Sequence, residues 1–372
     1  MSTNEEIGRR VLDGLGLLTQ SALAAQVDMT ADAMSRAVRG QRGFSSVELA
    51  EIADVLEVDV YWLITGHEDP MHVQVAARHD YNHETGKHSI PGRSTDEQDL
   101  GAVELAYRQA YLTGVSGRSA GPATPAAMRE ALGDDFVRDF AYRVEERLGV
   151  DVIRLPLLST AYSLTVGGHA VIVLPTAANW FRSNSDLAHE LGHLALGHHN
   201  AGSDVPTNEA PANSFATELL LPAEVVVKTP WHEMTGGQAA KFLWDTGVSG
   251  VYLRNRLDSL GLHASEQVRV VLNGKMPGAL RPHMSSLGES LTQQRGQFKV
   301  ISDPIDERMK VAAQRRFPLA LIAAHRAAVE SGRVVPATLA WMLDCGVDDL
   351  FDGLSEVQTP SGGDDDFSDF SR

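Results

Sequence analysis

The chain has 372 residues, which is enough for two or three domains with a sizeable hydrophobic core. Its net charge of −17 disfavours a general attraction to nucleic acid or to an anionic membrane, but it leaves room for a local basic patch. The single cysteine excludes an internal disulfide and a cysteine-rich structural metal site, and it favours a reduced, cytoplasmic protein. The N-terminal residues lack the apolar core of a secretory signal, and no stretch approaches the ~18 apolar residues of a membrane span.

Residues 1–68 are predicted to form an all-α domain of short helices. Apolar residues recur at helical spacing, and a pair of short helices is expected over 19–38, with the second beginning near Ala31. Ser45 and Glu48 have the spacing of a capping box, which predicts that a further helix begins there.

Residues 69–124 are predicted to form a linker followed by a helical arm, because the first part is polar and contains Pro70 and Pro91. The helical pattern of the arm runs from Val103 to Leu112. Residues 125–265 combine helical patterns with short alternating or apolar runs that predict strands. These strands are expected over 150–154, 162–166 and 169–174, with a glycine pair as the hairpin turn between the last two.

A central helix is predicted to begin near Asn184, with Ser183 as its cap, and another helix runs from about Glu209 to Leu221. The pattern is helical again from Ala239 to Leu260. Residues 266–358 are predicted to be a helical region, and 359–372 an acidic, disordered tail. The expected fold class is therefore α+β and mostly helical: an all-α N-terminal domain, a central α+β domain and a C-terminal helical region.

The central helix contains His189-Glu190-Leu191-Gly192-His193, which matches the pattern His-Glu-x-x-His. Positions four residues apart lie on one face of a helix, so both imidazoles can bind one metal ion. Glu190 is rotated by about 100° from His189, which suits a general base that does not ligate the ion. The pattern predicts a zinc-dependent peptidase site with His189 and His193 as ligands.

A catalytic zinc needs a third protein ligand, and two residues are candidates. His199 has the spacing of the metzincin pattern, but that pattern needs glycine at position 196, and this chain has Gly197 instead. Glu209 lies in a segment that resembles the second zinc helix of thermolysin-type (gluzincin) peptidases. This resemblance favours Glu209, and it implies that Asn213, one helical turn later, supports the ligands.

The two motifs together resemble the ImmA/IrrE family of bacterial metallopeptidases, over residues 125–265. The second segment resembles that family's Glu-x-x-Ala-Asn-x-Phe-Ala-x-x-Leu-Leu-x-Pro pattern through Glu209, Asn213, Phe215 and Pro222. The resemblance implies a zincin-like domain that binds Zn²⁺ and cleaves a repressor-type protein in the cytoplasm. A tyrosine or histidine that stabilises the oxyanion is also expected, and Tyr252, His232 and His263 remain open.

The helical pair over 19–38 resembles the Cro/CI-type (XRE) helix-turn-helix. Asp28 stands where that family usually has glycine. The resemblance implies operator DNA as a partner, no membrane partner, and an assembly compatible with a homodimer. By carry-over, the residues that would contact DNA are Gln20, Thr30, Ala31, Asp32, Ser35 and Arg36, with Arg39 and Arg42 on phosphates.

Two functional hypotheses follow from these resemblances. In the first, the protein is a DNA-binding regulator whose zinc endopeptidase cleaves a repressor or the chain itself. In the second, the peptidase-like domain senses a ligand or metal and cleaves nothing. Only the first hypothesis needs Glu190, because a sensor has no use for a general base.

Overall fold

The computed structural model describes residues 3–56, 58–67, 69, 73–77, 80–82, 87–89, 93–111, 121–177, 179–199, 208–286 and 303–350, with the backbone alone between 73 and 95 and at 284–286. Contacts divide the chain into two compact units, Met1–His72 and Val73–Arg372. The acidic tail predicted over 359–372 lies outside the described residues.

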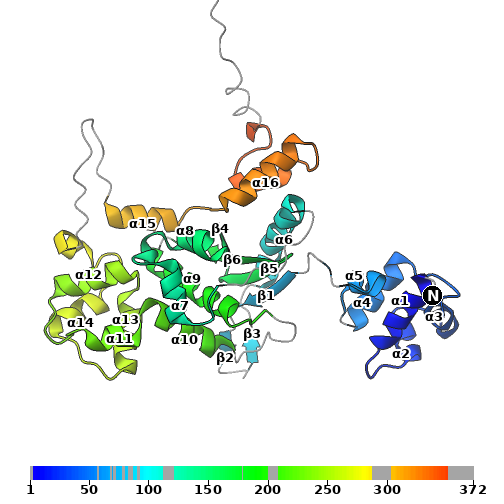
Figure 1. Ribbon diagram of the computed structural model, residues 1–372, viewed down its shortest axis with the longest axis horizontal. Helices are drawn as coiled ribbons and strands as arrows, with labels where there is room; N and C mark the ends of the chain where they lie inside the picture. The colour runs from blue at the N-terminus through cyan, green and yellow to red at the C-terminus, as the bar shows by residue number, and fades with distance from the viewer. Residues whose placement is uncertain are drawn as a thin grey trace, which may run out of the picture. The chain divides into compact units, whose positions relative to one another are not determined.

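The first unit is helical at the residues where the sequence pattern predicts helices (Figure 1). Its helices are α1 (Thr3–Asp13), α2 (Gln20–Gln26), α3 (Ala31–Val38), α4 (Ser46–Leu56) and α5 (Val60–Thr65). They pack around fully buried apolar side chains, one or more from each helix, which include Val11, Leu23, Met34, Ile52 and Leu63. A single small core therefore holds the unit together.

Side chains at the helix starts satisfy the first backbone amides of α2, α3 and α4. Thr19 and Thr30 each accept a hydrogen bond from the amide three residues later, at 3.1 Å. Ser45 accepts from the Glu48 amide at 3.2 Å, and the Glu48 carboxylate accepts from the Ser45 amide at 2.8 Å. The predicted capping box is confirmed, and these caps fix where the short helices begin.

The second unit is built on a four-stranded sheet in the order β1-β5-β6-β4. Its strands are β1 (Val73–Ala77), β4 (Asp151–Leu155), β5 (Tyr162–Val166) and β6 (His169–Pro175), and a separate pair is formed by β2 (Asp80–Asn82) and β3 (Lys87–Ser89). β4 is parallel to β6, whereas β5 is antiparallel to both β6 and β1. Gly167 and Gly168 have positive φ angles of 55° and 82°, which the tight β5–β6 turn requires. The three predicted strands are confirmed.

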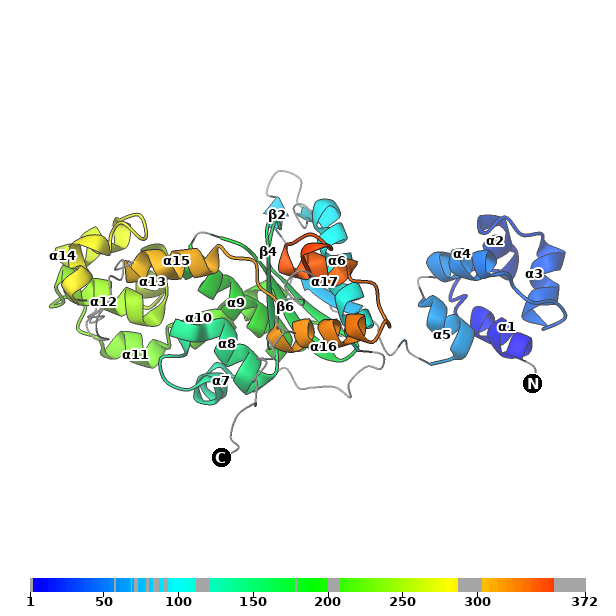
Figure 2. The same cartoon turned by 90° about the horizontal axis from the view of Figure 1, so that it is seen from above.

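Helices cover both faces of this sheet (Figure 2). On one face, α9 (Trp180–Ala195) contacts β5 and β6. On the other lie α6 (Arg93–Ala110), α16 (Leu319–Glu330) and α17 (Ala337–Leu343). Tyr162 of β5 donates a hydrogen bond at 2.7 Å to the buried Asp96 of α6, which fixes that helix to the sheet. Because both faces are covered, β4, β5 and β6 are buried along almost their whole length.

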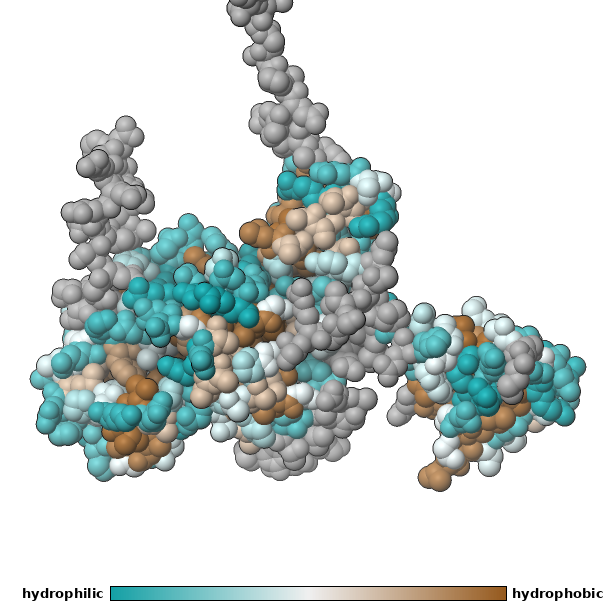
Figure 3. Space-filling model, viewed as in Figure 1, coloured by the Kyte–Doolittle hydropathy of each residue, from teal (hydrophilic) through white to brown (hydrophobic). Residues whose placement is uncertain are grey.

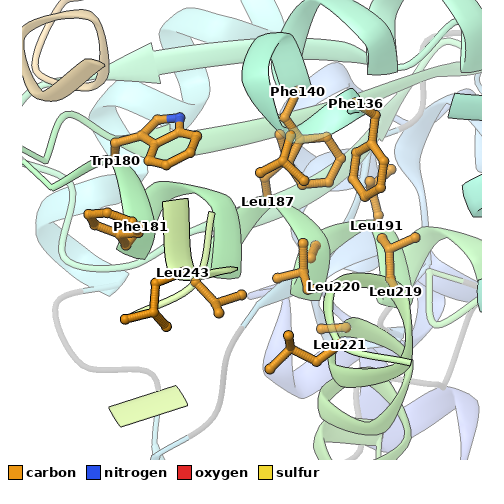
Figure 4. Close-up of a cluster of buried hydrophobic side chains, with 14 of the residues drawn as sticks. Phe136, Phe140, Trp180, Phe181, Leu187, Leu191, Leu219, Leu220, Leu221 and Leu243 are labelled. Atoms are coloured by element: carbon orange, nitrogen blue, oxygen red, sulfur yellow. The ribbon is translucent and has the colours of Figure 1, made fainter. Parts of the chain in front are cut away.

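The largest core lies between α9 and the helices on its outer side (Figure 4). Leu187 and Leu191 of α9 point toward Phe136 and Phe140, and Leu219 from α10 (Glu209–Leu220) joins them. The helices and turns that complete this half are α7 (Pro125–Leu132), η1 (Phe136–Asp139), α8 (Phe140–Arg143), η2 (Val144–Leu148), α11 (Ala223–Lys228), α12 (Gly236–Thr246), α13 (Gly250–Ser259), α14 (Glu266–Asn273), η4 (Arg281–Ser286) and α15 (Pro304–Ala312). This core anchors α9, the helix that carries the His-Glu-x-x-His motif.

Three local predictions were wrong. Helix α9 begins at Trp180, with Asn179 as its cap, because the Asn179 side chain accepts from the Arg182 amide at 3.3 Å. The helical pattern expected to run from Ala239 to Leu260 is interrupted at Gly247, whose φ of 63° ends α12. The predicted linker and arm contain strands β1 to β3, and α6 begins about ten residues earlier than the pattern suggested.

The surface seen in Figure 3 is largely hydrophilic, with small separate apolar patches. Within the described ranges, no helix combines the length and the apolar character needed to cross a membrane.

Candidate metal centre

Helix α9 brings the two motif histidines together. His189 and His193 are four residues apart, and their Nε2 atoms lie 3.1 Å from each other. Both rings are buried, at 6% and 2% exposure. As expected from the spacing of four residues, the helix directs two nitrogen donors to one point.

Helix α10 supplies a third donor from its first turn. Glu209 Oε2 lies 3.3 Å from His189 Nε2, and Glu209 Oε1 lies 3.7 Å from His193 Nε2. The approach of α10 depends on Gly192, since a Cβ at this position would lie 3.0 Å from the Ala212 carbonyl oxygen. The glycine inside the motif thus lets α10 pack against α9 closely enough for Glu209 to reach the histidines.

The three side chains fit a metal ion. One donor atom from each of His189, His193 and Glu209 lies within 4.8 Å of the others. Burial, together with the nearby His189, lowers the pKa of His193 to about 3, so its ring is neutral and has a lone pair to donate. Two imidazoles and one carboxylate form a ligand set that leaves a coordination position open.

Glu190 lies next to these donors on the side of α9 that faces the sheet. It is fully buried, and burial raises the pKa of its carboxyl group to about 7, although the nearby His189 and Ser163 lower it in part. Its two carboxylate oxygens have no hydrogen-bond partner within the described part of the chain. A carboxyl group with this pKa and free oxygens is suited to take up and release a proton near neutral pH.

His198 contacts the centre from the end of α9. Gly197 adopts a left-handed φ of 70°, and the His198 amide donates to the His193 carbonyl at 3.0 Å, so the chain folds back at the helix end. This turn places His198 Nδ1 3.0 Å from His193 Nδ1. His193 can then donate its Nδ1 proton to His198 and keep Nε2 free for a metal. The sequence pattern did not predict this contact, but a glycine directly after a helix is a signal for such a turn.

His199, the other candidate for the third ligand, lies elsewhere. It is 8% exposed and hydrogen-bonds to the backbone of Ser163, and it is not part of the converging group of donors. The turn at Gly197 explains this, because it directs His198 to His193 and leaves the next residue against the sheet. The structure therefore brings Glu209, and not His199, to the two motif histidines.

The residues expected in supporting roles are not among the converging donor atoms. Asn213 is exposed and lines a groove of about 360 Å³ between α10 and α13. In the same groove, the Tyr252 hydroxyl is 3.2 Å from Thr217 Oγ1, and Thr217 is about 12 Å along α10 from Glu209. His232 and His263 are exposed. The supporting role of Asn213 stays a prediction, as does the identity of the oxyanion-stabilising residue.

The residues predicted to contact DNA cluster on and around α3. Thr30, Ala31 and Asp32 are exposed, as are Arg36 and Arg39. Two arginines have partners within the helix. Arg36 pairs with Asp32 at 3.1 Å, and Arg39 donates to the Ser35 hydroxyl at 2.8 Å.

The remaining residues predicted to contact DNA lie outside α3. Gln20, at the start of α2, is half-buried, and Arg42 is half-buried and paired with Glu48. Asp28 has a φ of 49°, so the turn between α2 and α3 adopts the left-handed conformation that glycine or a short polar residue allows. The substitution of the usual glycine by Asp28 is thereby compatible with the turn.

Part of the second unit is similar to a known family of peptidases. Residues 145–258 match the IrrE N-terminal-like domain, a peptidase family. The IrrE-like range contains the motif on α9 and Glu209 on α10, and it supports the resemblance to the ImmA/IrrE metallopeptidases. The first unit lies outside the IrrE-like range. The searches found no significant match among curated proteins or solved structures.

Proposed function

We propose that the IrrE-like domain is a zinc-dependent endopeptidase, in which His189, His193 and Glu209 hold the ion and Glu190 is the general base. The observation that carries this proposal is the convergence of three donor atoms within 4.8 Å beside a fully buried carboxylate whose oxygens accept no hydrogen bond of normal geometry among the described residues. A helix with two ordinary histidines would need neither the glutamate on α10 nor the buried one.

The chemistry divides between the ion and the side chains. Zinc, when bound, acidifies water and polarises a peptide carbonyl. Glu190 takes up the proton of the attacking water and returns it to the leaving amine, which its buried position beside the ligands allows. His198 Nδ1 accepts a hydrogen bond from the Nδ1 proton of His193, which leaves His193 Nε2 unprotonated so that it can hold the ion.

We propose that the first unit binds operator DNA through α3 and that the substrate is a repressor-type protein or the chain itself. Exposed Arg36 and Arg39 supply the positive charge, although Asp32 offsets part of it at 3.1 Å from Arg36. The whole chain has a net charge of −17, which disfavours DNA binding elsewhere on the protein, so binding depends on this local face.

The deciding experiment compares the zinc-loaded wild type with Glu190→Gln and with Glu224→Gln. Glu224 is exposed on α11 and serves as the matched control. Each protein is incubated alone and with helix-turn-helix repressors encoded near its gene, and the products are identified by mass. We expect the wild type and Glu224→Gln to cleave, and Glu190→Gln to bind zinc without cleaving.

Cleavage that persists in Glu190→Gln would contradict the assigned general base. If no variant cleaves while zinc and operator DNA are both bound, the protein is a regulator whose peptidase-like domain senses a ligand or the metal. The product masses also locate the scissile bond, which separates cleavage of a partner from cleavage of the chain itself.

A further inference from the structure

A segment of the chain itself occupies the sheet edge beside the candidate site. β1 contains the first residues of the second unit and pairs antiparallel with β5, from Val73 opposite Val166 to Ala77 opposite Tyr162. β5 is bonded to β6 along its other side. In the described part of the sheet, β1 is therefore an edge strand that covers the one otherwise open side of β5.

The strand register places this edge next to Glu190. Side chains alternate along β5, and Tyr162 is directed to Asp96 on α6. Ser163 is therefore directed to the opposite face, where α9 packs and where its hydroxyl approaches Glu190. Ala76 lies opposite Ser163. A backbone on this edge is thus one strand spacing, about 4.8 Å, from the residue that borders the proposed general base.

An endopeptidase must hold its substrate extended so that the scissile bond is accessible, and a sheet edge does this by adding the peptide as a further strand. We infer that, when substrate is absent, residues 73–77 of the chain occupy the edge of β5 that an extended segment of the protein substrate would otherwise bind. The inference rests on the proposed peptidase function. β1 already shows that the edge of β5 accepts an antiparallel strand.

Pairing of β1 with the edge of β5 should weaken the binding of substrate at that edge by an amount that can be measured. The apparent affinity of a competing substrate falls in proportion to the fraction of molecules whose edge is free. If β1 is paired about nine-tenths of the time, its release should lower KM roughly tenfold and leave kcat unchanged. In the sequence, β1 follows directly after the first unit, so the competing segment is the first part of the second unit.

The test uses two single proline variants of the full chain, Gln74→Pro and Val75→Pro. Successive amides of a strand point to opposite sides, so only one of the two variants removes a hydrogen bond to β5, and the other is its matched control. Hydrogen exchange of residues 162–166 is measured in both, with exchange in α9 as the check that the unit is folded. We expect faster exchange of β5 in one variant alone.

A synthetic peptide with the sequence of residues 71–79 is then added. It should restore slow exchange of β5 in the variant with the released strand, and that variant should show the lower KM when loaded with zinc. Equal β5 exchange in both variants, or no restored protection, would overturn the inference, as would cleavage with an unchanged KM. Restored protection without cleavage by any protein would instead overturn the peptidase and retain the strand site.

Discussion

His198 shows how one residue outside the motif acts on a residue within it. Its Nδ1 atom is 3.0 Å from His193 Nδ1, which leaves His193 Nε2 as the atom directed at His189 and Glu209. An imidazole whose second nitrogen is hydrogen-bonded keeps one tautomer and one ring orientation. The geometry therefore makes His198 a positioning residue for the metal ligand.

We expect His198→Ala to lower the affinity for zinc by roughly 10- to 100-fold, as is typical when the partner of a ligating histidine is lost. His198→Asn should retain most of the affinity, because its side-chain oxygen can accept the same proton. Competition with a chromophoric chelator gives the dissociation constants. His232→Ala is the control, since His232 is exposed and lies 3.3 Å from its exposed neighbour Glu233. Similar zinc affinity in all of these proteins would show that His198 does not act on the ligand.

The spacing of residues predicted the parts of the site that lie within one helix, but it did not predict the contacts that form between elements. The convergence of His189 and His193 follows from helical spacing alone. The position of Glu209 needed the family resemblance, because nothing in the spacing of residues chooses between it and His199. The contact of His198 depends on the left-handed turn at Gly197, and the approach of Ser163 to Glu190 depends on how β5 packs on α9.

At the scale of helices, the site depends on the distance between α9 and α10. A Cβ on Gly192 would lie 3.0 Å from the Ala212 carbonyl oxygen and 3.3 Å from Phe215 Cβ, so α10 would have to move away. Overpacking of this kind costs about 1–3 kcal/mol, which outweighs the roughly 1 kcal/mol that alanine gains over glycine in a helix. Because Glu209 moves with α10, the metal ligands would separate as well.

Gly192→Ala should therefore lower both the stability of the second unit and its zinc affinity. Urea unfolding, followed through the second unit, and the same chelator competition measure the two effects. Gly101→Ala is the matched control. Gly101 is on an exposed position of α6 with open space around it, so alanine there should stabilise the protein by about 0.5–1 kcal/mol. If both alanine variants are stabilised, close packing at Gly192 does not set the position of α10.

Helices and strands were predicted correctly where the local sequence determines them, and they were missed or misplaced where contacts with other elements determine them. Strands β5 and β6 were predicted from their apolar runs and the glycine pair between them. The start of α9 was misplaced because Trp180 and Phe181, which precede the predicted cap, are buried in the core and extend the helix. β1 was missed because its short, partly polar sequence becomes a strand through pairing with β5.

At the scale of the whole chain, a buried histidine joins the C-terminal helices to α6. His325 of α16 is fully buried, and its Nε2 is 2.6 Å from the Ala106 carbonyl oxygen. Burial lowers the pKa of His325, despite its hydrogen bond to Ala106. The folded state therefore holds the neutral ring at a pH where the unfolded chain, with a histidine pKa of about 6.5, has bound a proton.

The sign of the resulting pH dependence follows from this difference. As pH falls below about 6.5, the unfolded state binds more protons than the folded state, so the free energy of unfolding decreases until the lower folded pKa is reached. The limiting slope is about 1.4 kcal/mol per pH unit for one proton. His325→Gln can still donate to Ala106, and it should remove this contribution. Chemical denaturation of the metal-free wild type and His325→Gln between pH 5 and 7 tests this. If the free energy of unfolding changed with pH by the same amount in both proteins, the prediction would be contradicted.

The division into two units also leads to a prediction about which helices zinc binding stabilises. The donors of the candidate centre all lie in the second unit, whereas the core of the first unit is formed by α1 to α5. A ligand stabilises the unit that binds it, by about 2.7 kcal/mol at a free concentration of 100 times its dissociation constant. Zinc should therefore slow hydrogen exchange in α9 and α10 and leave exchange in α1 to α5 unchanged.

His189→Ala supplies the control, because it removes one donor while the first unit keeps its sequence. Zinc should have no effect on exchange in this variant, and a chelator should reverse the effect in the wild type. Slower exchange in α1 to α5 upon zinc binding, lost in His189→Ala, would instead mean that the metal couples the two units. In that case occupancy of the centre would change the helices proposed to bind DNA, and the independence of the two units argued from their separate cores would be wrong.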